Sequence, residues 1–157
     1  MTVPGGYIAG DVLTAANLNL LPGGKMGYAE VTADQSTITT VADLTSLTVT
    51  WTAVAARRYR LTFEGSLETS SAPSVNTVYI TNSSNTAVAT RAFSLAANAS
   101  AGETPQWVGA TVTLTGLSGS VTYKVRAAYT PDSVGSLTLK ASATAPAYFL
   151  VEDIGPA

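Results

Sequence analysis

The 157-residue chain contains no cysteine and no histidine. The absence of cysteine excludes disulfide bonds, thiolate nucleophiles and thiolate metal ligands. The absence of histidine removes the commonest general base and a frequent metal ligand. Most hydrolase active sites and most zinc sites are therefore excluded, and we expect a protein that is not an enzyme and binds no cofactor.

Charge is also scarce. Charged residues make up 11% of the chain, against about 25% in ordinary soluble domains. A surface with so few charges is poorly protected against association, so we expect other subunits to cover much of it. The net charge of −2 does not provide the basic surface that nucleic-acid binding needs, and we predict no nucleic-acid partner.

Long apolar runs are missing as well. No run approaches the ~20 residues needed to cross a bilayer, and the opening residues lack the basic stretch and apolar segment of a signal peptide. We therefore predict no membrane contact and synthesis in a cytoplasm without export by the usual route. The length suits one domain, which would remove roughly 70% of its unfolded surface from water on folding.

A short helix is predicted near residues 14–21. Thr14 can cap its N-terminus, and Leu13 and Leu18 occupy the two positions of a hydrophobic staple. Pro22-Gly23-Gly24 ends the helix. Because so short a helix is unstable alone, its leucines must pack on another surface. We interpret residues 1–24 as an N-terminal docking arm.

From Lys25 onward the pattern changes to strands. Apolar residues alternate with threonines and charged residues over 47–52, 58–64, 108–114 and 121–129, as in half-buried antiparallel strands. Further candidate strands lie near 26–32, 36–41, 75–81, 86–94, 136–142 and 147–153, and turn-forming residues separate the segments. The sequence thus predicts an all-β fold, an antiparallel β-sandwich over residues 25–157, with a jelly roll favoured over an immunoglobulin-like sandwich.

Two segments look like catalytic motifs, and both fail. A phosphate-binding loop ending at Gly24-Lys25 would require glycine in place of Asn19 and serine or threonine in place of Met26. The segment Gly116–Ser120 resembles a nucleophile elbow, but serine replaces its last glycine and no histidine exists to activate Ser118. We predict a turn there.

Paired carboxylates can hydrolyse glycosides without histidine. Glu64 and Glu68 share one strand face, about 13 Å apart at ~3.3 Å per residue, beyond the ~5–9.5 Å that this chemistry needs. Glu152 and Asp153 are adjacent and should point to opposite faces of a strand. We predict solvated or ion-paired carboxylates in both places.

Two surface features leave alternatives open. Trp107 has the opposite parity to the apolar stripe that begins at Val108, so it should face away from that stripe. An exposed tryptophan is a stacking platform for sugars, which makes a carbohydrate-binding module the alternative function, although the pattern favours a subunit interface or core position. Arg58 and Arg60 lie on the outward face of a strand, where ion pairing, with Glu64 or Glu68 on a neighbouring strand, or a subunit contact is favoured over an anion site.

The segment from Gly6 to Asn19 resembles the opening of many structural proteins of tailed bacteriophages. Those proteins often begin with an aromatic residue, a glycine followed by an acid, then Leu-Thr-Ala and a closing Leu-Asn, as in Tyr7, Gly10-Asp11, Leu13-Thr14-Ala15 and Leu18-Asn19 here. The remainder is similar in style to small minor tail, short fibre or head-surface (decoration) proteins of phages that infect actinobacteria, in particular at residues 27–29, 57–61 and 151–156.

The resemblance implies a structural component of a virion, without enzymatic activity. Its arm would be buried in the particle against other tail or capsid proteins, and its β domain would be displayed on the virion surface, often as a homotrimer. The arm residues expected to dock are Tyr7, Asp11, Leu13, Thr14, Leu18, Asn19 and Leu20. No shaft repeat or receptor-binding tip follows the arm, so attachment to a host surface glycan is not implied by the resemblance.

Overall fold

The computed structural model describes residues 21–70, 74–95, 105–131 and 135–157, all as strands, turns or loops. These residues include every strand that the alternation predicts. The strands are β1 (Gly24–Val31), β2 (Gln35–Ile38), β3 (Ala42–Ala53), β4 (Arg57–Thr69), β5 (Ser74–Asn82), β6 (Ala87–Leu95), β7 (Gln106–Leu114), β8 (Gly119–Pro131), β9 (Leu137–Lys140) and β10 (Ala147–Pro156).

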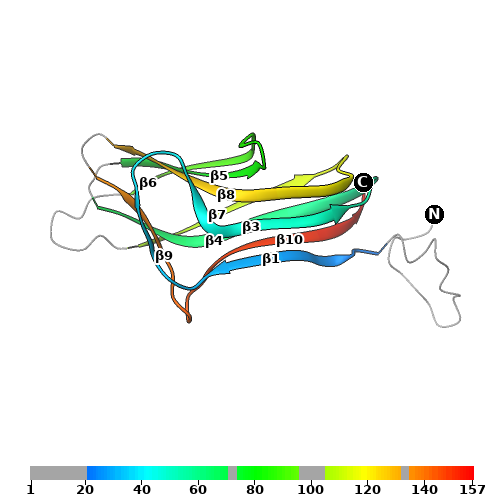
Figure 1. Ribbon diagram of the computed structural model, residues 1–157, viewed down its shortest axis with the longest axis horizontal. Helices are drawn as coiled ribbons and strands as arrows, with labels where there is room; N and C mark the ends of the chain where they lie inside the picture. The colour runs from blue at the N-terminus through cyan, green and yellow to red at the C-terminus, as the bar shows by residue number, and fades with distance from the viewer. Residues whose placement is uncertain (1–20, 71–73, 96–104, 132–134) are drawn as a thin grey trace, which may run out of the picture.

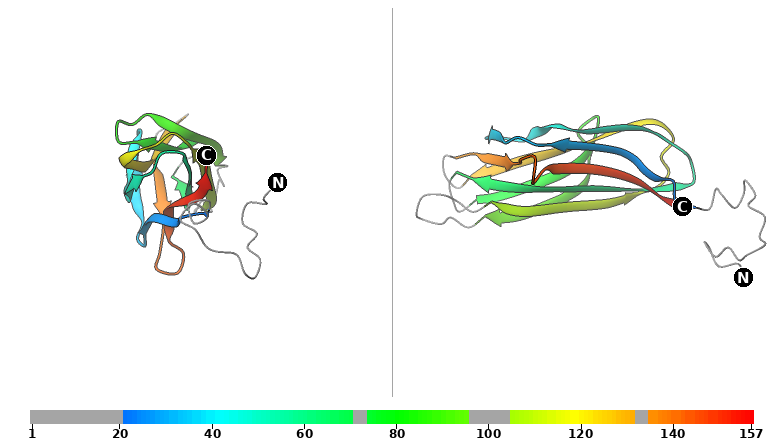
Figure 2. Two further views of the ribbon diagram at one scale, coloured as in Figure 1. Left: turned by 90° about the vertical axis from the view of Figure 1, so that its right-hand side faces the viewer. Right: turned by 90° about the horizontal axis from the view of Figure 1, so that it is seen from below.

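The strands form two sheets that pack face to face in an elongated sandwich (Figure 1). One sheet contains β1, β2, β4, β7, β9 and β10, and the other has the order β3-β8-β5-β6. In the first sheet β4 pairs with β7 along one edge and with β10 and then β9 along the other. Figure 2 shows β1 and β10, in blue and red, side by side along the length of the sandwich.

The pairing is nested from the ends of the chain inward. β1 and β2 pair with β10 and β9, β3 pairs with β8, β4 with β7, and β5 with β6, all antiparallel. A long hairpin rolled up into two sheets has this order, whereas the first two strands of an immunoglobulin-like domain pair with each other. The topology therefore favours the jelly-roll prediction over the immunoglobulin-like one.

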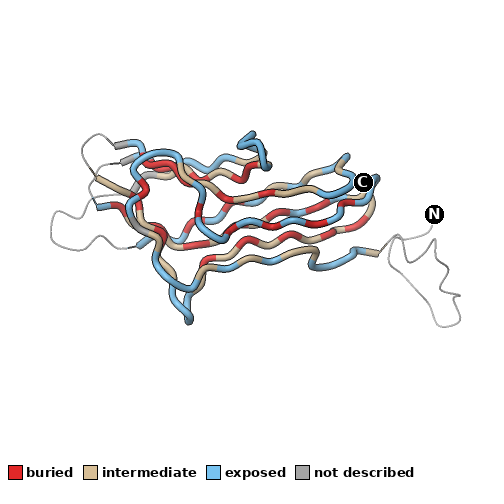
Figure 3. Tube along the Cα trace, in the orientation of Figure 1, coloured by how far each residue is buried: buried red, intermediate tan, exposed pale blue. Residues whose placement is uncertain are grey.

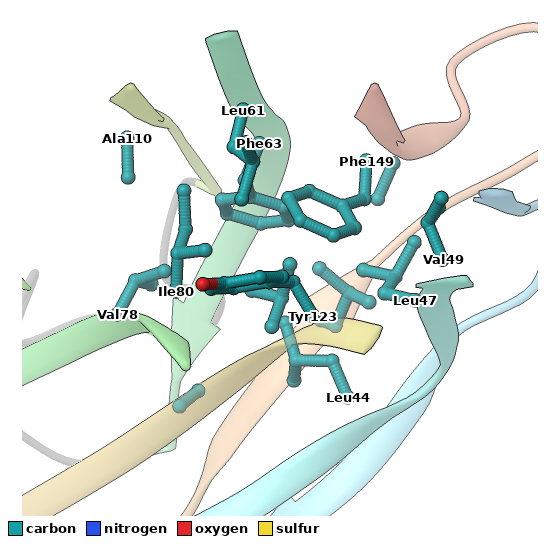
Figure 4. Close-up of a cluster of buried hydrophobic side chains, with 14 of the residues drawn as sticks. Leu44, Leu47, Val49, Leu61, Phe63, Val78, Ile80, Ala110, Tyr123 and Phe149 are labelled. Atoms are coloured by element: carbon teal, nitrogen blue, oxygen red, sulfur yellow. The ribbon is translucent and has the colours of Figure 1, made fainter. Parts of the chain in front are cut away.

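One hydrophobic core fills the space between the sheets. Burial alternates along the strands, as the period of two predicts (Figure 3). Phe63 and Phe149 from the first sheet face Tyr123 and Ile80 from the second (Figure 4). Trp51 is buried, as its apolar stripe predicts, and its ring lies 5.5 Å from that of Tyr123 between centroids.

The turn predictions hold at two hairpins. Residues 115–118 connect β7 to β8, which agrees with a turn rather than a nucleophile elbow, and Gly116 and Gly119 both have a φ of +72°. Residues 83–86 connect β5 to β6, where the side chain of Asn82 accepts hydrogen bonds from the amides of Ser84 and Thr86. Asx hydrogen bonding of this kind is a common way to stabilise a tight turn.

The docking arm lies largely outside the described residues. This holds for the helix predicted near residues 14–21, of which only Leu21 is described, and for Tyr7, Asp11, Leu13, Thr14, Leu18, Asn19 and Leu20. Across the described ranges, the structure contains no helix long and apolar enough to cross a membrane.

Candidate functional site

A buried ion pair lies at the end of the sandwich where the described chain begins and where the C-terminus is found (Figure 1). Arg57 is the first residue of β4, and its Nε lies 2.6 Å from Oδ2 of Asp153 in β10. The two side chains are only 14% and 8% exposed. Two opposite charges removed from water to this extent need further hydrogen bonds to offset their lost hydration.

Those hydrogen bonds come from the chain that leads into β1. Arg57 Nη2 donates to the carbonyl oxygen of Leu21 at 2.7 Å, and Asp153 accepts from the backbone amides of Gly155, at 2.9 Å, and Gly23. A Cβ atom on Gly23 would lie 2.6 Å from Asp153 Oδ2, so a larger residue would push the carboxylate away. We call Leu21, Gly23, Arg57, Asp153 and Gly155 the junction cluster, because they tie the chain that leads into β1 to the sandwich.

The electrostatics of the junction cluster keep Asp153 ionised. Burial raises the pKa of Asp153, but the hydrogen bonds from Arg57 and Gly155 and the Arg57 charge outweigh it, so the pKa lies below its ordinary value. An ionised carboxylate that is already saturated with donors is unsuited to proton transfer. The contacts of the cluster connect residues 21–23 to β4 and β10.

The sequence contains a signal for this buried ion pair in the alternation of β10. Ala147, Phe149, Val151 and Asp153 share the inward parity of β10 and are all buried. A carboxylate at the end of an apolar stripe requires a cation beside it. The adjacent Glu152 faces outward, as predicted, so the two neighbouring acids have different environments.

The C-terminal residues form contacts at the same end of the sandwich. The amide of Ala157 donates to the carbonyl oxygen of Ala56 at 2.8 Å, and Gly24 pairs with Asp153 as β1 begins. Residues 21–24, the β3–β4 turn and the last residues of β10 are thus tied together.

Arg60 is ion-paired, but its partner differs from the prediction. Its Nη2 lies 2.8 Å from Oε2 of Glu152, which stands directly opposite it on β10. Glu64 and Glu68 are in the same strand as Arg60, so they cannot meet it from a neighbouring strand, and that expectation was wrong. The neighbouring Arg58 is exposed on the same strand.

Trp107 is 56% exposed and lies on the outer face of β7. Its predicted parity is therefore confirmed, and a core position is excluded for the single chain. Its partner on β4 is Ser66, six residues beyond Arg60 and eight beyond Arg58. At ~3.3 Å per residue, the tryptophan lies about 20 Å from Arg60 and about 26 Å from Arg58 along the sheet. The structure does not bring Trp107, Arg58 and Arg60 into one site.

A shallow groove of about 250 Å³ runs beside Ser66 on this outer face. We call it the outer groove; it is lined by Asp34, Ser66, Pro105, Lys140, Ala141, Ser142 and Ala145. These residues come from four separate stretches of the chain, so the sequence alone did not group them. The described part of the chain holds no group of three or more acidic residues that could bind a metal ion.

Comparison with known proteins gives only distant similarity. No family model and no curated protein matches the chain. Among solved structures, it is similar to a chain of the T13 viral particle of IBDV, at 15% identity and a TM-score of 0.44, over 85% of this chain and 36% of that one. It is also similar to a mutant VP2 protein of infectious bursal disease virus in derived T=1 particles, at 15% identity and a TM-score of 0.39, over 85% of this chain and 37% of that one.

This chain thus spans little more than a third of the length of either neighbour. With TM-scores this low, the two neighbours assign neither a fold family nor a function to it.

Proposed function

We propose that this protein is a non-enzymatic structural component of a tailed-phage virion, docked through its N-terminal arm and displayed as a β domain on the particle surface. The observation that carries the proposal is the junction cluster. A buried ion pair and its hydrogen bonds hold residues 21–23 against the sandwich, so the preceding arm starts from a fixed position. Such an anchor suits a domain held by its arm.

Three other features support the proposal. The low charge of the chain favours coverage by other subunits. The nested pairing of a jelly roll occurs in viral capsid domains, although the same architecture also serves lectins and cupins, so the fold alone does not decide the function. The resemblance of Gly6–Asn19 to phage structural proteins adds the class of particle, as a minor tail, short fibre or capsid decoration protein of a phage that infects actinobacteria.

Deletion of residues 1–20 is expected to give a folded β domain that no longer enters particles. We choose a cut after residue 20, inside the predicted arm of residues 1–24, because Leu21 and Gly23 belong to the junction cluster and should be retained. The measurement is the amount of truncated protein in purified particles, with circular dichroism of the isolated domain as the control for folding. Incorporation at the level of the full chain would contradict docking through the arm.

We further propose that the displayed form is a homotrimer. Low surface charge favours self-association, and the phage structural proteins that the chain resembles are often trimeric. Sedimentation equilibrium of the full chain at micromolar concentration should give three times the mass of one chain. A stable monomer would contradict the proposal.

A further inference from the structure

Trp107, Ser66 and Lys140 form one row on the outer face of the six-stranded sheet. They lie in β7, β4 and β9, and the register places Ser66 between the other two. Neighbouring strands are about 4.8 Å apart, so roughly 10 Å separates the backbones of Trp107 and Lys140. Ser66 and Lys140 both line the outer groove, and Trp107, although it does not line the groove itself, pairs with Ser66 at its edge.

The polar wall of the outer groove is preorganised. Lys140 Nζ donates to Asp34 Oδ2, and Asp34 Oδ1 accepts the amide of Ala141 at 2.9 Å. Glu68 Oε2 lies 3.6 Å from the same ammonium group. The wall therefore presents a fixed ammonium group with remaining donor capacity next to carboxylate oxygens with remaining acceptor capacity.

The groove and the indole differ in chemistry. Trp107 offers a large, exposed apolar face, whereas the groove beside it combines apolar Pro105, Ala141 and Ala145 with the ion pair and the hydroxyl groups of Ser66 and Ser142. A ligand that uses both must have an apolar face and a rim of groups that donate and accept hydrogen bonds. A pyranose has this construction, with C–H groups on its face and hydroxyl groups around its edge.

The charge and the size of the outer groove restrict the class of ligand further. Asp34 and Glu68 outnumber Lys140, so a phosphate or a carboxylate would be repelled, and a neutral sugar is favoured. The groove of about 250 Å³ is smaller than the ~300–1,000 Å³ of typical small-molecule pockets. It therefore suits one sugar unit, with the rest of a longer glycan lying outside.

We propose that Trp107 and the outer groove bind one neutral pyranose unit of a glycan. The indole stacks on the face of the sugar, and Lys140 and Asp34 hydrogen-bond its hydroxyl groups. This adds a ligand to the proposed virion component but does not depend on that role. Binding is measured on the isolated full chain and docking on particles, so either proposal can fail without the other.

The test is a titration of the full chain with a panel of neutral methyl glycosides, followed by saturation-transfer difference NMR. At least one glycoside should bind saturably in the millimolar range, and Trp107→Ala should weaken it about tenfold or more, as expected when an aromatic anchor is truncated. Ser66→Leu keeps the indole but fills the groove, and it should weaken binding as strongly. Tyr28→Ala removes another exposed aromatic ring from the same sheet face and should leave affinity within about twofold.

Circular dichroism of each variant checks that the fold is unchanged. The proposal is overturned if no glycoside binds saturably, or if Trp107→Ala binds as well as the parent chain. It is also overturned if sedimentation shows that Trp107→Ala dissociates an oligomer while the glycosides neither bind nor compete with it. In that case the tryptophan is a contact between copies of this chain.

Discussion

Replacement of Asp153 by alanine is expected to lower the free energy of unfolding by about 3–5 kcal/mol, the usual cost of removing one partner from a buried ion pair. The substitution leaves the Arg57 guanidinium in a site where its side chain is only 14% exposed. It also leaves the amide of Gly155 without its side-chain acceptor. Urea denaturation followed by circular dichroism measures the change.

Glu152→Ala is the matched control, because Glu152 precedes Asp153 in the chain and also forms an ion pair. The Arg60–Glu152 pair is exposed, at 47% and 28% of the two side chains, and exposed pairs contribute about 0–1 kcal/mol. The two variants should therefore differ by at least about 2 kcal/mol. Equal effects would show that the junction cluster does not anchor the base of the arm.

The same difference should depend on pH in a defined direction. The folded-state pKa of Asp153 is lowered from its ordinary value of 3.8, so the ion pair contributes its full stability above that pH. The contribution is lost as the pH falls below 3.8 and through the folded-state pKa, since a protonated Asp153 no longer pairs with Arg57. The gap in unfolding free energy between the parent chain and Asp153→Ala should close in acid; a gap that stayed constant would contradict the pairing.

Replacement of Phe63 by alanine is the second large effect expected. Phe63 is fully buried in β4 between Phe149 on β10 and Ala110 on β7, and its ring faces the second sheet (Figure 4). Removal of a buried phenyl ring from a close-packed core costs about 3–5 kcal/mol, partly from lost burial and partly from the cavity. Chemical denaturation at neutral pH should show this loss as a lower midpoint with a similar slope.

Thr62→Ala serves as the control for this variant. Thr62 is the preceding residue of β4 and points outward, so its replacement should change stability by no more than about 0.5 kcal/mol. If Phe63→Ala were as mild as Thr62→Ala, the two sheets would not pack around this residue. The assignment of inner and outer faces would then be wrong.

The strands were predictable because burial between two sheets leaves a period of two in the sequence. The stripe that includes Tyr59, Leu61 and Phe63 is the inner face of β4, and the stripe from Val108 to Leu114 is the inner face of β7. The strand predicted near residues 36–41 corresponds to β2, which ends earlier than predicted, at Ile38. Thr37, with a φ of +69°, lies inside β2, where the register with β9 shifts between Gln35 and Ile38, so this short strand is irregular.

The candidate sites were harder to predict from the sequence, because they depend on the register between strands that are distant in the chain. The pairing of Arg57 with Asp153 joins residues 96 positions apart, and Lys140 meets Asp34 across 106 positions. Parity could place Asp153 on an inner face and Trp107 on an outer one. It could not show that Ser66 separates Trp107 from Lys140, because nothing local to those residues sets the alignment of β4 with β7 and β9.

The central claim, a virion component held by its arm, is tested most directly by locating the protein in purified particles. Electron microscopy with a label fused after Ala157 should show the label on the particle surface close to the attachment point, because the C-terminus lies at the junction end of the sandwich. Deletion of residues 1–20 should abolish the labelled positions. Purified particles that carry no label when the full chain is present would contradict the claim.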